Sequence, residues 1–442
     1  MTQVAATTPR GRAFGRPRAR RPSRPITSSD MPAPLRGPGP LDGVTVLDFS
    51  RVLAGPHCGR MLADLGADVI KIEPPEGDMT RFSYPRRNSI ATYFAQQNVG
   101  KRNISLDLKR PAAVDLLERL AAGADVVVEN FRPGVMERLG LGYDDLAAGN
   151  PRLVYVSISG YGQTGPWVDR RAYAPVVNAE SGVTWLQGEA RGGKYANDPL
   201  SHGDVYTALE GVIAVLAALY QRARTGRGQW VELSMAETLL CINEHVHWFL
   251  RDDPEATGDD ELPSFLPGEY PVLPTAEGHR VVIAGHPAGN GTFQMYCRAM
   301  DRTDLVDDPR LSTVGGRRRH LDVIMDALAG WSSTFDDLDA LEAAFEAQGL
   351  AMGVLRTLRE IGETDWAAAR GAIVEVSDRG DGVVRVPNSP WHFGDADSGV
   401  RGEPAYRGEH NREVLAEKLG LDDDALDALE AEGVLSSRLP AR

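Results

Sequence analysis

Two nearly identical turns constrain the fold of this chain more than any other feature. Residues 65–68 read LGAD before the apolar run VIKIE, and residues 122–125 read AGAD before the run VVVEN. In each case a helical stretch ends at a glycine, Gly66 or Gly123, which suits the left-handed conformation common at helix C-termini. The β-branched run that follows is typical of a buried parallel strand. This pattern predicts an α/β fold with a doubly wound parallel sheet.

Further strands and helices alternate from residue 41 onward. The two helical stretches, 56–66 and 111–122, each carry a proline in the first turn, where a missing N–H is harmless. No extended internal repeat is present, since two similar turns do not make a repeating unit. The predicted strands are Val44–Phe49, Val69–Ile72, Ile104–Leu106, Val126–Val128 and Leu153–Ile158.

Residues 1–40 differ in composition from the rest of the chain. They hold eight Arg, eight Pro and one acidic residue, so this tail carries +7 and the remainder −21 of the net charge of −14. A segment so poor in apolar residues cannot bury enough surface to fold, and we expect a disordered tail. Its prolines argue against an amphipathic transit peptide, which favours Met31 as the true start. The acidic body would oppose nucleic-acid binding through the tail, so no nucleic-acid partner is expected.

The cysteines and apolar runs bear on compartment and environment. Cys58, Cys241 and Cys297 are few, far apart and odd in number, which argues against a disulfide framework and fits a cytoplasmic location. No Cys/His spacing typical of a metal site occurs, so no metal is expected. The longest wholly apolar run, Gly211–Tyr220, falls short of the roughly 20 residues that span a bilayer. We therefore expect a protein without a membrane partner.

Loops at the carboxyl ends of parallel strands are the usual ligand-binding places in such sheets. Neither a GxGxxG nor a GxxxxGK[ST] motif follows the first strand, which argues against a nicotinamide dehydrogenase and a P-loop kinase. The strand-end segments NVGKR and ENFRPG are instead cationic. Lys101, Arg102, Arg132 and Arg138, in or beside these segments, are able to bind phosphates, and a solvated surface role is the alternative for each.

Asp204 stands at the head of a long apolar helix. Apolar residues recur at helical spacing from Val205 to Leu219, a stripe wide enough to be buried on most sides. Unpaired backbone N–H groups and the helix dipole favour an ionised carboxylate at this end. A helix cap is the structural alternative, because aspartate is a preferred N-cap residue.

Seven segments, in order, resemble the class III (formyl-CoA and carnitine) CoA-transferase family. The resemblance is dense over residues 41–250 and thinner at GEHNREVLAEKLGL (408–421). The 2-methylacyl-CoA racemases share the same scaffold, so the motifs are less specific for the reaction. The segments are LDGVTVLDFSRVLAGPHCGRMLADLGADVIKIEPPEGD, NVGKRNISLDL, ADVVVENFRPGVMERLG, NPRLVYVSISGYGQTGP, AYAPVVNAESG, GD at 203–204 and RTGRGQWVELSM.

The resemblance implies a covalent mechanism and a set of site residues. Asp204 matches the family's nucleophilic aspartate, which attacks an acyl-CoA thioester and then carries CoA as an aspartyl thioester. The expected substrates are an acyl-CoA and a free carboxylic acid, with coenzyme A bound only as part of the substrate and no tightly bound cofactor. Tyr173 falls on an active-site tyrosine. The residues expected to contact the coenzyme are Lys101, Arg102, Asn130, Phe131, Arg138 and Tyr173.

The family's fold implies a domain plan. Two chains interlock as a homodimer, each threaded through the other, and a large Rossmann-like domain is completed by the C-terminal segment. Here the expected large domain covers 41–250 and a linker covers 251–261. A smaller α/β domain is expected over 262–375, with a hairpin around Ala276–Gly278 and a helical pattern from Leu321 to Phe345, and 376–442 is expected to return to the large domain.

Departures from the family pattern leave alternatives open. Leu53 and Pro74 stand where formyl-CoA transferase carries a glutamine and an arginine, so formyl or oxalyl specificity is unsupported. The segment AGHPAGNG (284–291) matches the mobile glycine loop of that enzyme loosely, and a surface turn is the equal alternative. A racemase or a catalytically silent CoA-binding homologue are the rival functions. A racemase needs a histidine where this chain has Tyr173.

Overall fold

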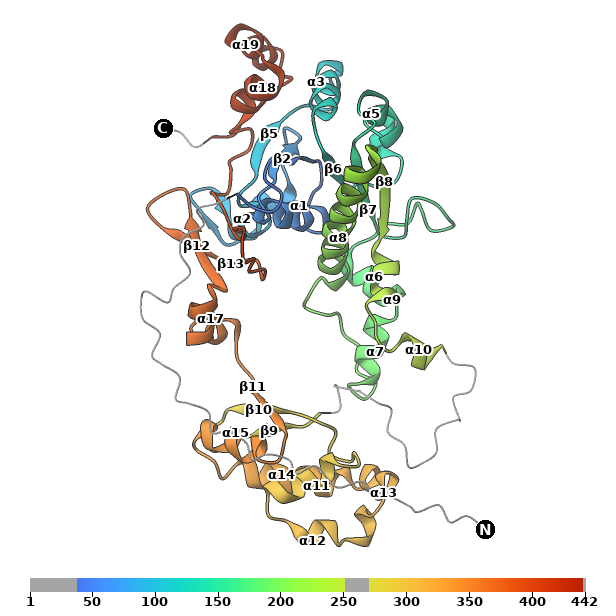
Figure 1. Ribbon diagram of the computed structural model, residues 1–442, viewed down its shortest axis with the longest axis vertical. Helices are drawn as coiled ribbons and strands as arrows, with labels where there is room; N and C mark the ends of the chain where they lie inside the picture. The colour runs from blue at the N-terminus through green and yellow to red at the C-terminus, as the bar shows by residue number, and fades with distance from the viewer. Residues whose placement is uncertain (1–37, 251–269, 440–442) are drawn as a thin grey trace, which may run out of the picture.

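The computed structural model describes residues 38–250 and 270–439 (Figure 1). A large α/β domain forms one end of the molecule and a small domain the other. The expected linker at 251–261 and nearly all of the expected disordered tail, with Met31, lie outside the described residues. Each domain has its own sheet. The segment that follows β11 connects the two domains along one side of the molecule.

The large domain is built on a parallel sheet of six strands in the order β5-β2-β1-β6-β7-β8. In this doubly wound arrangement the direction of winding reverses between β1 and β6, the position where such sheets bind ligands. The predicted α/β class with a parallel sheet is thus confirmed. Strand β8 was not predicted, because on the edge of the sheet its side chains alternate between exposed and partly buried. The strands are β1 (Thr45–Asp48), β2 (Asp68–Glu73), β5 (Arg102–Ser105), β6 (Val126–Glu129), β7 (Val154–Ser159) and β8 (Gln229–Ser234).

Helices cover both faces of this sheet. Successive residues of a strand point to opposite faces, so Val46 of β1 packs with α1 and α8, whereas Leu47 packs with α3 and the C-terminal α18. The C-terminal segment therefore contributes to the core of the large domain. The helices of this domain include α1 (Ala54–Asp64), α2 (Thr92–Asn98), α3 (Pro111–Ala122), α4 (Val135–Arg138), α5 (Tyr143–Gly149), α6 (Ala174–Glu180), α7 (Val183–Glu189), α8 (His202–Thr225), α9 (Met235–Cys241), α10 (Val246–Phe249), α18 (Asn411–Leu419) and α19 (Asp423–Ala431).

The two glycine turns differ from each other. Gly66 adopts the predicted left-handed conformation, with φ at +100°. Gly123 has φ at −103°, so the same prediction is wrong there. The two glycines hold different positions at the helix ends. Leu65 is the C-cap of α1, so Gly66 follows the cap, whereas Gly123 is itself the C-cap of α3. Only the position after the cap requires a left-handed residue.

Helix α8 departs from the expectation that it is buried on most sides. It packs against α1, β7 and α9, but Ile213, Leu216 and Tyr220 are 57%, 39% and 69% exposed along its outer face. By length and composition alone α8 is long and apolar enough to cross a membrane, with a mean hydropathy of 1.4. The core helix of a domain passes the same test, and 39% of the apolar window is buried here.

The small domain has its own sheet and core. Strands β9 (Val272–Pro274) and β10 (Arg280–Ala284) form the hairpin expected around Ala276–Gly278, and β11 (Ala351–Val354) completes an antiparallel sheet of three strands. The expected helical pattern is divided between α14 (Leu321–Ser332) and α15 (Leu338–Glu346). The other helices here are α11 (Thr292–Ala299), α12 (Thr303–Val306) and α13 (Val314–Arg319).

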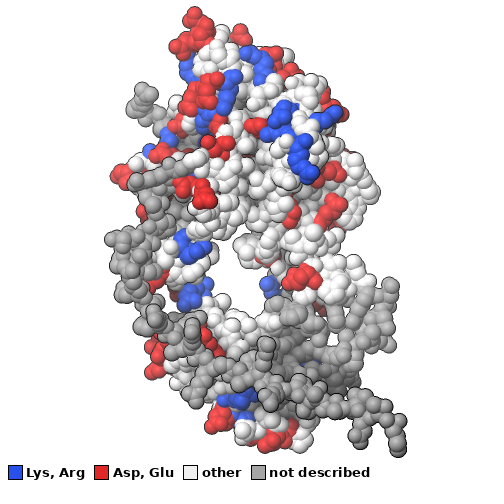
Figure 2. Space-filling model, viewed as in Figure 1, with Lys and Arg blue, Asp and Glu red and all other residues white. Residues whose placement is uncertain are grey.

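The return to the large domain begins inside the expected small domain. After α16 (Leu358–Gly362) and α17 (Asp365–Arg370), strands β12 (Ile373–Ser377) and β13 (Val383–Pro387) form a hairpin. This hairpin packs on α2 through a shared apolar cluster, so the boundary expected at 375 falls within a strand of the returning segment. Figure 2 shows an opening through the molecule between the large and small domains.

Candidate active site

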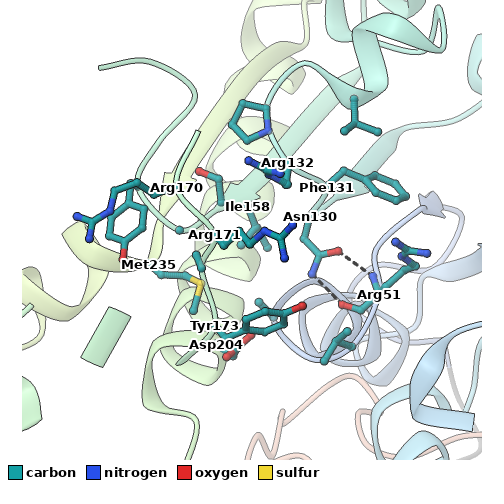
Figure 3. Close-up of a pocket in the computed structure, with 18 of the residues that line it drawn as sticks. Arg51, Asn130, Phe131, Arg132, Ile158, Arg170, Arg171, Tyr173, Asp204 and Met235 are labelled. Carbon is teal, nitrogen blue, oxygen red and sulfur yellow. Dashed lines mark hydrogen bonds between the residues drawn. The ribbon is translucent and has the colours of Figure 1, made fainter. Parts of the chain in front are cut away.

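A cavity of about 680 Å³ opens at the carboxyl edge of the large sheet. Its wall comes from the segments that follow β1, β2, β6, β7 and β8, so it lies at the ligand-binding edge that the topology predicts. Figure 3 shows side chains from these segments converging on it. The lining residues used below are Arg51, Val52, Ala54, Asn130, Phe131, Arg132, Tyr161, Arg170, Arg171, Tyr173, Asp204 and Met235.

Asp204 lies where the N-termini of three helices meet. It is the third residue of α8, whose cap is Ser201, so Asp204 is not itself the helix cap. The backbone N–H groups of Ala54, Ala174 and Asp204 lie around its carboxylate and favour the ionised form. Ala54 is the first residue of α1 and Ala174 the first of α6. First-turn N–H groups have no partner within their own helix, so they are free to bind an anion.

Burial and these N–H groups act in opposite directions on Asp204. Removal from water raises the pKa of the Asp204 carboxyl to about 6, and the three backbone N–H groups limit that rise. The expectation of an ionised carboxylate thus holds near neutral pH, but burial makes the charge less stable than the helix N-terminus alone implies. A partly desolvated carboxylate is a better nucleophile than a fully solvated one.

Two tyrosines lie around this carboxylate. Tyr173, predicted as a site residue, lines the cavity and precedes Ala174 at the start of α6, and Figure 3 shows its ring beside Asp204. Tyr93 of α2 was not predicted. Burial, followed by the negative charges of Asp204 and Asp78, raises the pKa of Tyr93 to about 12. Tyr93 is therefore a neutral phenol close to the Asp204 carboxylate.

Four arginines make the cavity cationic. Arg51, Arg132, Arg170 and Arg171 line it, whereas Asp204 is the one acidic residue among its described lining residues. Arg170 pairs with Glu180 and stacks over Trp167. Arg171 has no ion-pair partner among the described residues, and in Figure 3 its guanidinium projects into the cavity. Such a wall suits the phosphates of a nucleotide coenzyme or the carboxylate of an acid.

Asn130 and Phe131 lie on the cavity wall at the end of β6, as expected for coenzyme contacts. The Asn130 side chain accepts a hydrogen bond from Arg51 N at 2.7 Å and donates one to Arg51 O at 2.8 Å, the two dashed lines of Figure 3. The Arg51 guanidinium lies 5.2 Å from the centre of the Phe131 ring. Asn130 thus joins the loops that follow β1 and β6 at the winding reversal.

Three residues expected to contact the coenzyme lie elsewhere. The buried Lys101 ammonium bonds to Asp48 Oδ2 at 2.8 Å, Pro56 O at 2.7 Å and Asn98 Oδ1 at 3.0 Å, which leaves no proton for a phosphate. Arg102 pairs with carboxylates of β2 and α18. Exposed Arg138 ends the short helix α4, and only the start of that helix lines the cavity. This structure supports no coenzyme contact for Lys101 or Arg102 and does not place Arg138 on the cavity wall.

Several residues in or near the cavity were missed from the sequence. Arg51 directly follows the first strand, and its place at a strand end was an available signal. Arg171 precedes Tyr173 by two residues, so the predicted tyrosine indicated its neighbourhood. Tyr93 carried no signal, because it lies on a helix between strands rather than at a strand end. The glycine loop at 284–291 joins β10 to α11 in the small domain, and none of its residues lines the cavity.

A doubly wound sheet that carries a buried carboxylate among arginines at its ligand-binding edge suits an enzyme that acts on an anionic, nucleotide-linked substrate. Residues 41–411 match CoA-transferase family III, and the chain belongs to this family. It is a class III CoA-transferase, as the resemblance implied. Among the described residues no cluster of metal-ligating side chains occurs.

The chain matches known proteins along nearly the whole length of each. Succinyl-CoA--D-citramalate CoA-transferase of Chloroflexus aurantiacus is 33% identical over 90% of this chain and 99% of its own. Succinyl-CoA:glutarate CoA-transferase of Mus musculus is 33% identical over 90% of both chains. A crystal structure of a CAIB/BAIF family protein from Brucella suis is 31% identical, covers 87% of this chain and 100% of its own, and superposes with a TM-score of 0.73.

Proposed function

We propose that the enzyme moves CoA from an acyl-CoA to a free carboxylic acid through a covalent thioester on Asp204. The observation that carries this proposal is the position of Asp204, the one carboxylate among the described lining residues of an arginine-rich cavity. Three backbone N–H groups lie around its carboxylate, and no arginine forms an ion pair with it among the described residues, so an oxygen is left to act as a nucleophile.

The proposed steps balance without any other reactant. The Asp204 carboxylate attacks the thioester carbonyl, the C–S bond breaks, and a mixed anhydride and CoA thiolate form. The thiolate attacks the Asp204 carbonyl carbon, which releases the donor acid and leaves an aspartyl-CoA thioester. The acceptor carboxylate then repeats the sequence in reverse, and Asp204 is regenerated. One hard exchange is thereby divided into easier steps.

The names of the relatives suggest the first substrates to test. They act on succinyl-CoA with citramalate or glutarate, and another relative is a formyl-CoA:oxalate CoA-transferase from Streptomyces coelicolor. We propose short dicarboxylic acids as acceptors, supported by the excess of arginine over carboxylate in the cavity. A panel of acyl-CoA esters against mono- and dicarboxylic acids, read by mass spectrometry of the CoA products, tests this choice.

Trapping of the intermediate tests the mechanism. Donor acyl-CoA without acceptor, followed by borohydride reduction or hydroxylamine and peptide mapping, is expected to mark Asp204. Asp204→Asn, which keeps the side-chain shape, and Asp204→Ala are expected to form no adduct and exchange no label between CoA and acid. An adduct on another carboxylate would refute the assignment. Acyl-CoA binding without any exchange in the wild type would instead indicate a silent homologue.

We further propose that the enzyme is an interlocked homodimer. The opening in Figure 2 and the exposed apolar face of α8 support this, because a chain threaded through the opening and packed on that face would bury both. Light scattering at the mass of two chains, retained on dilution, is the expected result. The free cysteines of the described chain fit the predicted cytoplasmic location.

A further inference from the structure

The short turn between β1 and α1 is held by buried charges rather than by ordinary loop contacts. Ser50 N donates to Asp48 Oδ1 at 3.0 Å, and Ser50 O accepts from Lys71 Nζ at 2.8 Å. Val52 N donates to Asp78 Oδ2 at 3.2 Å. With Arg51 bound on both sides by Asn130, nearly every backbone polar group of residues 50–52 has a fixed side-chain partner. Such complete satisfaction rigidifies a loop.

Val52 needs this restraint. Its φ is +70°, in the left-handed region that a β-branched residue adopts only under strain. Strained residues persist where their surroundings determine them, and they cluster at functional sites. Two residues after Val52 the helix α1 begins at Ala54, whose N–H lies beside the Asp204 carboxylate and favours its ionised form. The unusual conformation therefore sets the direction from which this donor approaches the nucleophile.

The restraint depends on charges that have been taken fully out of water. Lys71 and Asp78 have exposed side-chain fractions of 1% and 0%, and their charged atoms lie 3.3 Å apart. Burying an ion pair costs several kcal/mol per ion before the pair attracts, so apolar residues would serve a purely structural role as well. Lys71 and Asp78 also lie in a network with Lys101, Arg81, Asp48 and Glu73, which sets three cations against three carboxylates.

We propose that Lys71 and Asp78 are positioning residues for CoA transfer. Their buried pair holds Val52 in its left-handed conformation and thereby directs the Ala54 N–H at the Asp204 carboxylate. Neither residue touches substrate, since neither lines the cavity. This inference rests on the proposed role of Asp204 as the nucleophile.

Loss of the pair would change the ionisation of Asp204. The Ala54 N–H favours the ionised form, so its displacement makes Asp204 harder to ionise. The groups facing Asp204 from other elements are the neutral Tyr93 of α2 and Tyr173 before α6, with the cavity arginines around them. Of these groups, only Arg51 is next to Val52 in the chain. A shift in the titration of Asp204 therefore reports mainly on the Ala54 donor.

The test removes both charges together, because a neutral pair leaves no uncompensated ion in the core. Lys71→Met/Asp78→Asn is compared with Arg60→Met/Asp64→Asn, which removes another buried pair, 2.7 Å apart, from the far end of the same helix α1. The carboxyl carbons of aspartate are labelled with ¹³C, the Asp204 resonance is assigned by its loss in Asp204→Asn, and its titration midpoint is measured by NMR. Turnover with acyl-CoA and acid is measured in parallel.

We expect Lys71→Met/Asp78→Asn to raise the Asp204 midpoint by about one pH unit and to lower turnover about tenfold, the effect of losing one hydrogen bond to a charged group. Adding Val52→Gly should restore at least half of both changes, because glycine adopts a positive φ without restraint. The control pair should leave the midpoint unchanged. An unchanged midpoint in Lys71→Met/Asp78→Asn, an equal shift in the control, or no rescue by Val52→Gly would overturn the proposal. A shifted midpoint in an enzyme that traps no CoA would instead refute the proposed function alone.

Discussion

The backbone N–H of Ala54 lies beside the carboxylate of Asp204 and favours its ionised form. The two residues are 150 positions apart and belong to helices on the same face of the sheet. Because α1 follows β1 in the middle of the sheet and α8 precedes β8 at its side, this relationship links the centre of the sheet to one outer strand. The Asp204 carboxylate is thus positioned by the whole fold and not by its own helix alone.

The pH dependence of the first half-reaction should report on Asp204. Only the ionised carboxylate attacks, and burial raises its pKa to about 6. The rate of aspartyl-CoA formation is therefore expected to be constant above about pH 7, to halve at about pH 6, and to fall about tenfold per unit below that. Single-turnover trapping between pH 4.5 and 8 measures it. A midpoint near pH 4 would show that the carboxylate is solvated in the working enzyme.

The pH dependence of folding stability tests the raised pKa of Asp204 by a second route. In the folded state the carboxyl holds its proton up to about pH 6, whereas in the unfolded chain it ionises near its ordinary pKa of 3.8. The contribution of Asp204 to stability is therefore present below pH 3.8 and lost as the pH rises through 6. The unfolding temperature of the wild type should fall, relative to Asp204→Asn, over this interval. Parallel curves for the two proteins would contradict the raised pKa.

The adjacent residues Arg170 and Arg171 should differ in their contribution to acyl-CoA binding. Arg171 projects into the cavity without an ion-pair partner among the described residues, whereas Arg170 pairs with Glu180. Arg171→Gln should raise the KM for acyl-CoA about tenfold and weaken its salt dependence, as for the loss of one charge-assisted hydrogen bond. Arg170→Gln should have a smaller effect. Exposed Arg227, before β8 at the opposite edge of the sheet, is the control, and an equal loss in Arg227→Gln would point to a general charge effect.

The fold and the place of Asp204 at a helix start could be predicted from the sequence because their signals are local. A β-branched run between glycine turns indicates a buried parallel strand wherever it occurs, and Asp204 followed directly by apolar residues indicates a helix start. The predicted α/β class and the family are confirmed. Strand β8 escaped prediction because an edge strand is half exposed and carries a mixed pattern.

The remaining parts of the site depend on the direction in which each side chain points, and the sequence pattern does not determine that direction. Lys101 lies in a cationic segment, yet its side chain points inward to Asp48, while Arg171 points into the cavity. A sequence shows that a cation follows a strand but not which face it takes when a buried carboxylate lies nearby. Tyr93 reaches Asp204 only through packing of α2, a contact between segments 111 residues apart (93 to 204). Such contacts are set by tertiary packing.

Neighbouring Lys101 and Arg102 should differ sharply in their effect on stability. Lys101→Met leaves the buried Asp48 carboxylate without its nearest partner, at 2.8 Å, and should lower the free energy of unfolding by about 3–5 kcal/mol. Arg102→Met breaks pairs with Asp68, Glu413 and Glu417, all of them partly exposed, and should cost about 1 kcal/mol. Denaturant unfolding compares them. Lys101→Met/Asp48→Asn should recover much of the loss, and equal costs for the two single variants would contradict the buried position of Lys101.

The transferase is separated from the racemase by the fate of the α-proton. A racemase needs two acid/base groups on opposite sides of the carbon next to the thioester. Besides Asp204 the described cavity wall offers tyrosines and no histidine, and phenols ordinarily titrate near pH 10. Burial and the charge of Asp204 raise the pKa of nearby Tyr93, on α2, to about 12. His202 is not available, because its Nδ1 lies 3.1 Å from Asp198 Oδ2, its ring stacks on Tyr206, and it lines a separate cavity.

We therefore expect no deuterium at the α-carbon of 2-methylacyl-CoA esters incubated with the enzyme in heavy water, while label passes from acyl-CoA to an acceptor acid in the same preparation. Mass spectrometry of recovered ester and product follows both reactions at once. His202→Gln should leave transfer within about twofold of the wild type, since a residue outside the cavity adds no transition-state contact. Rapid deuterium incorporation that requires both Asp204 and His202 would reverse the assignment, because it would show that the two residues flank one substrate carbon in the working enzyme.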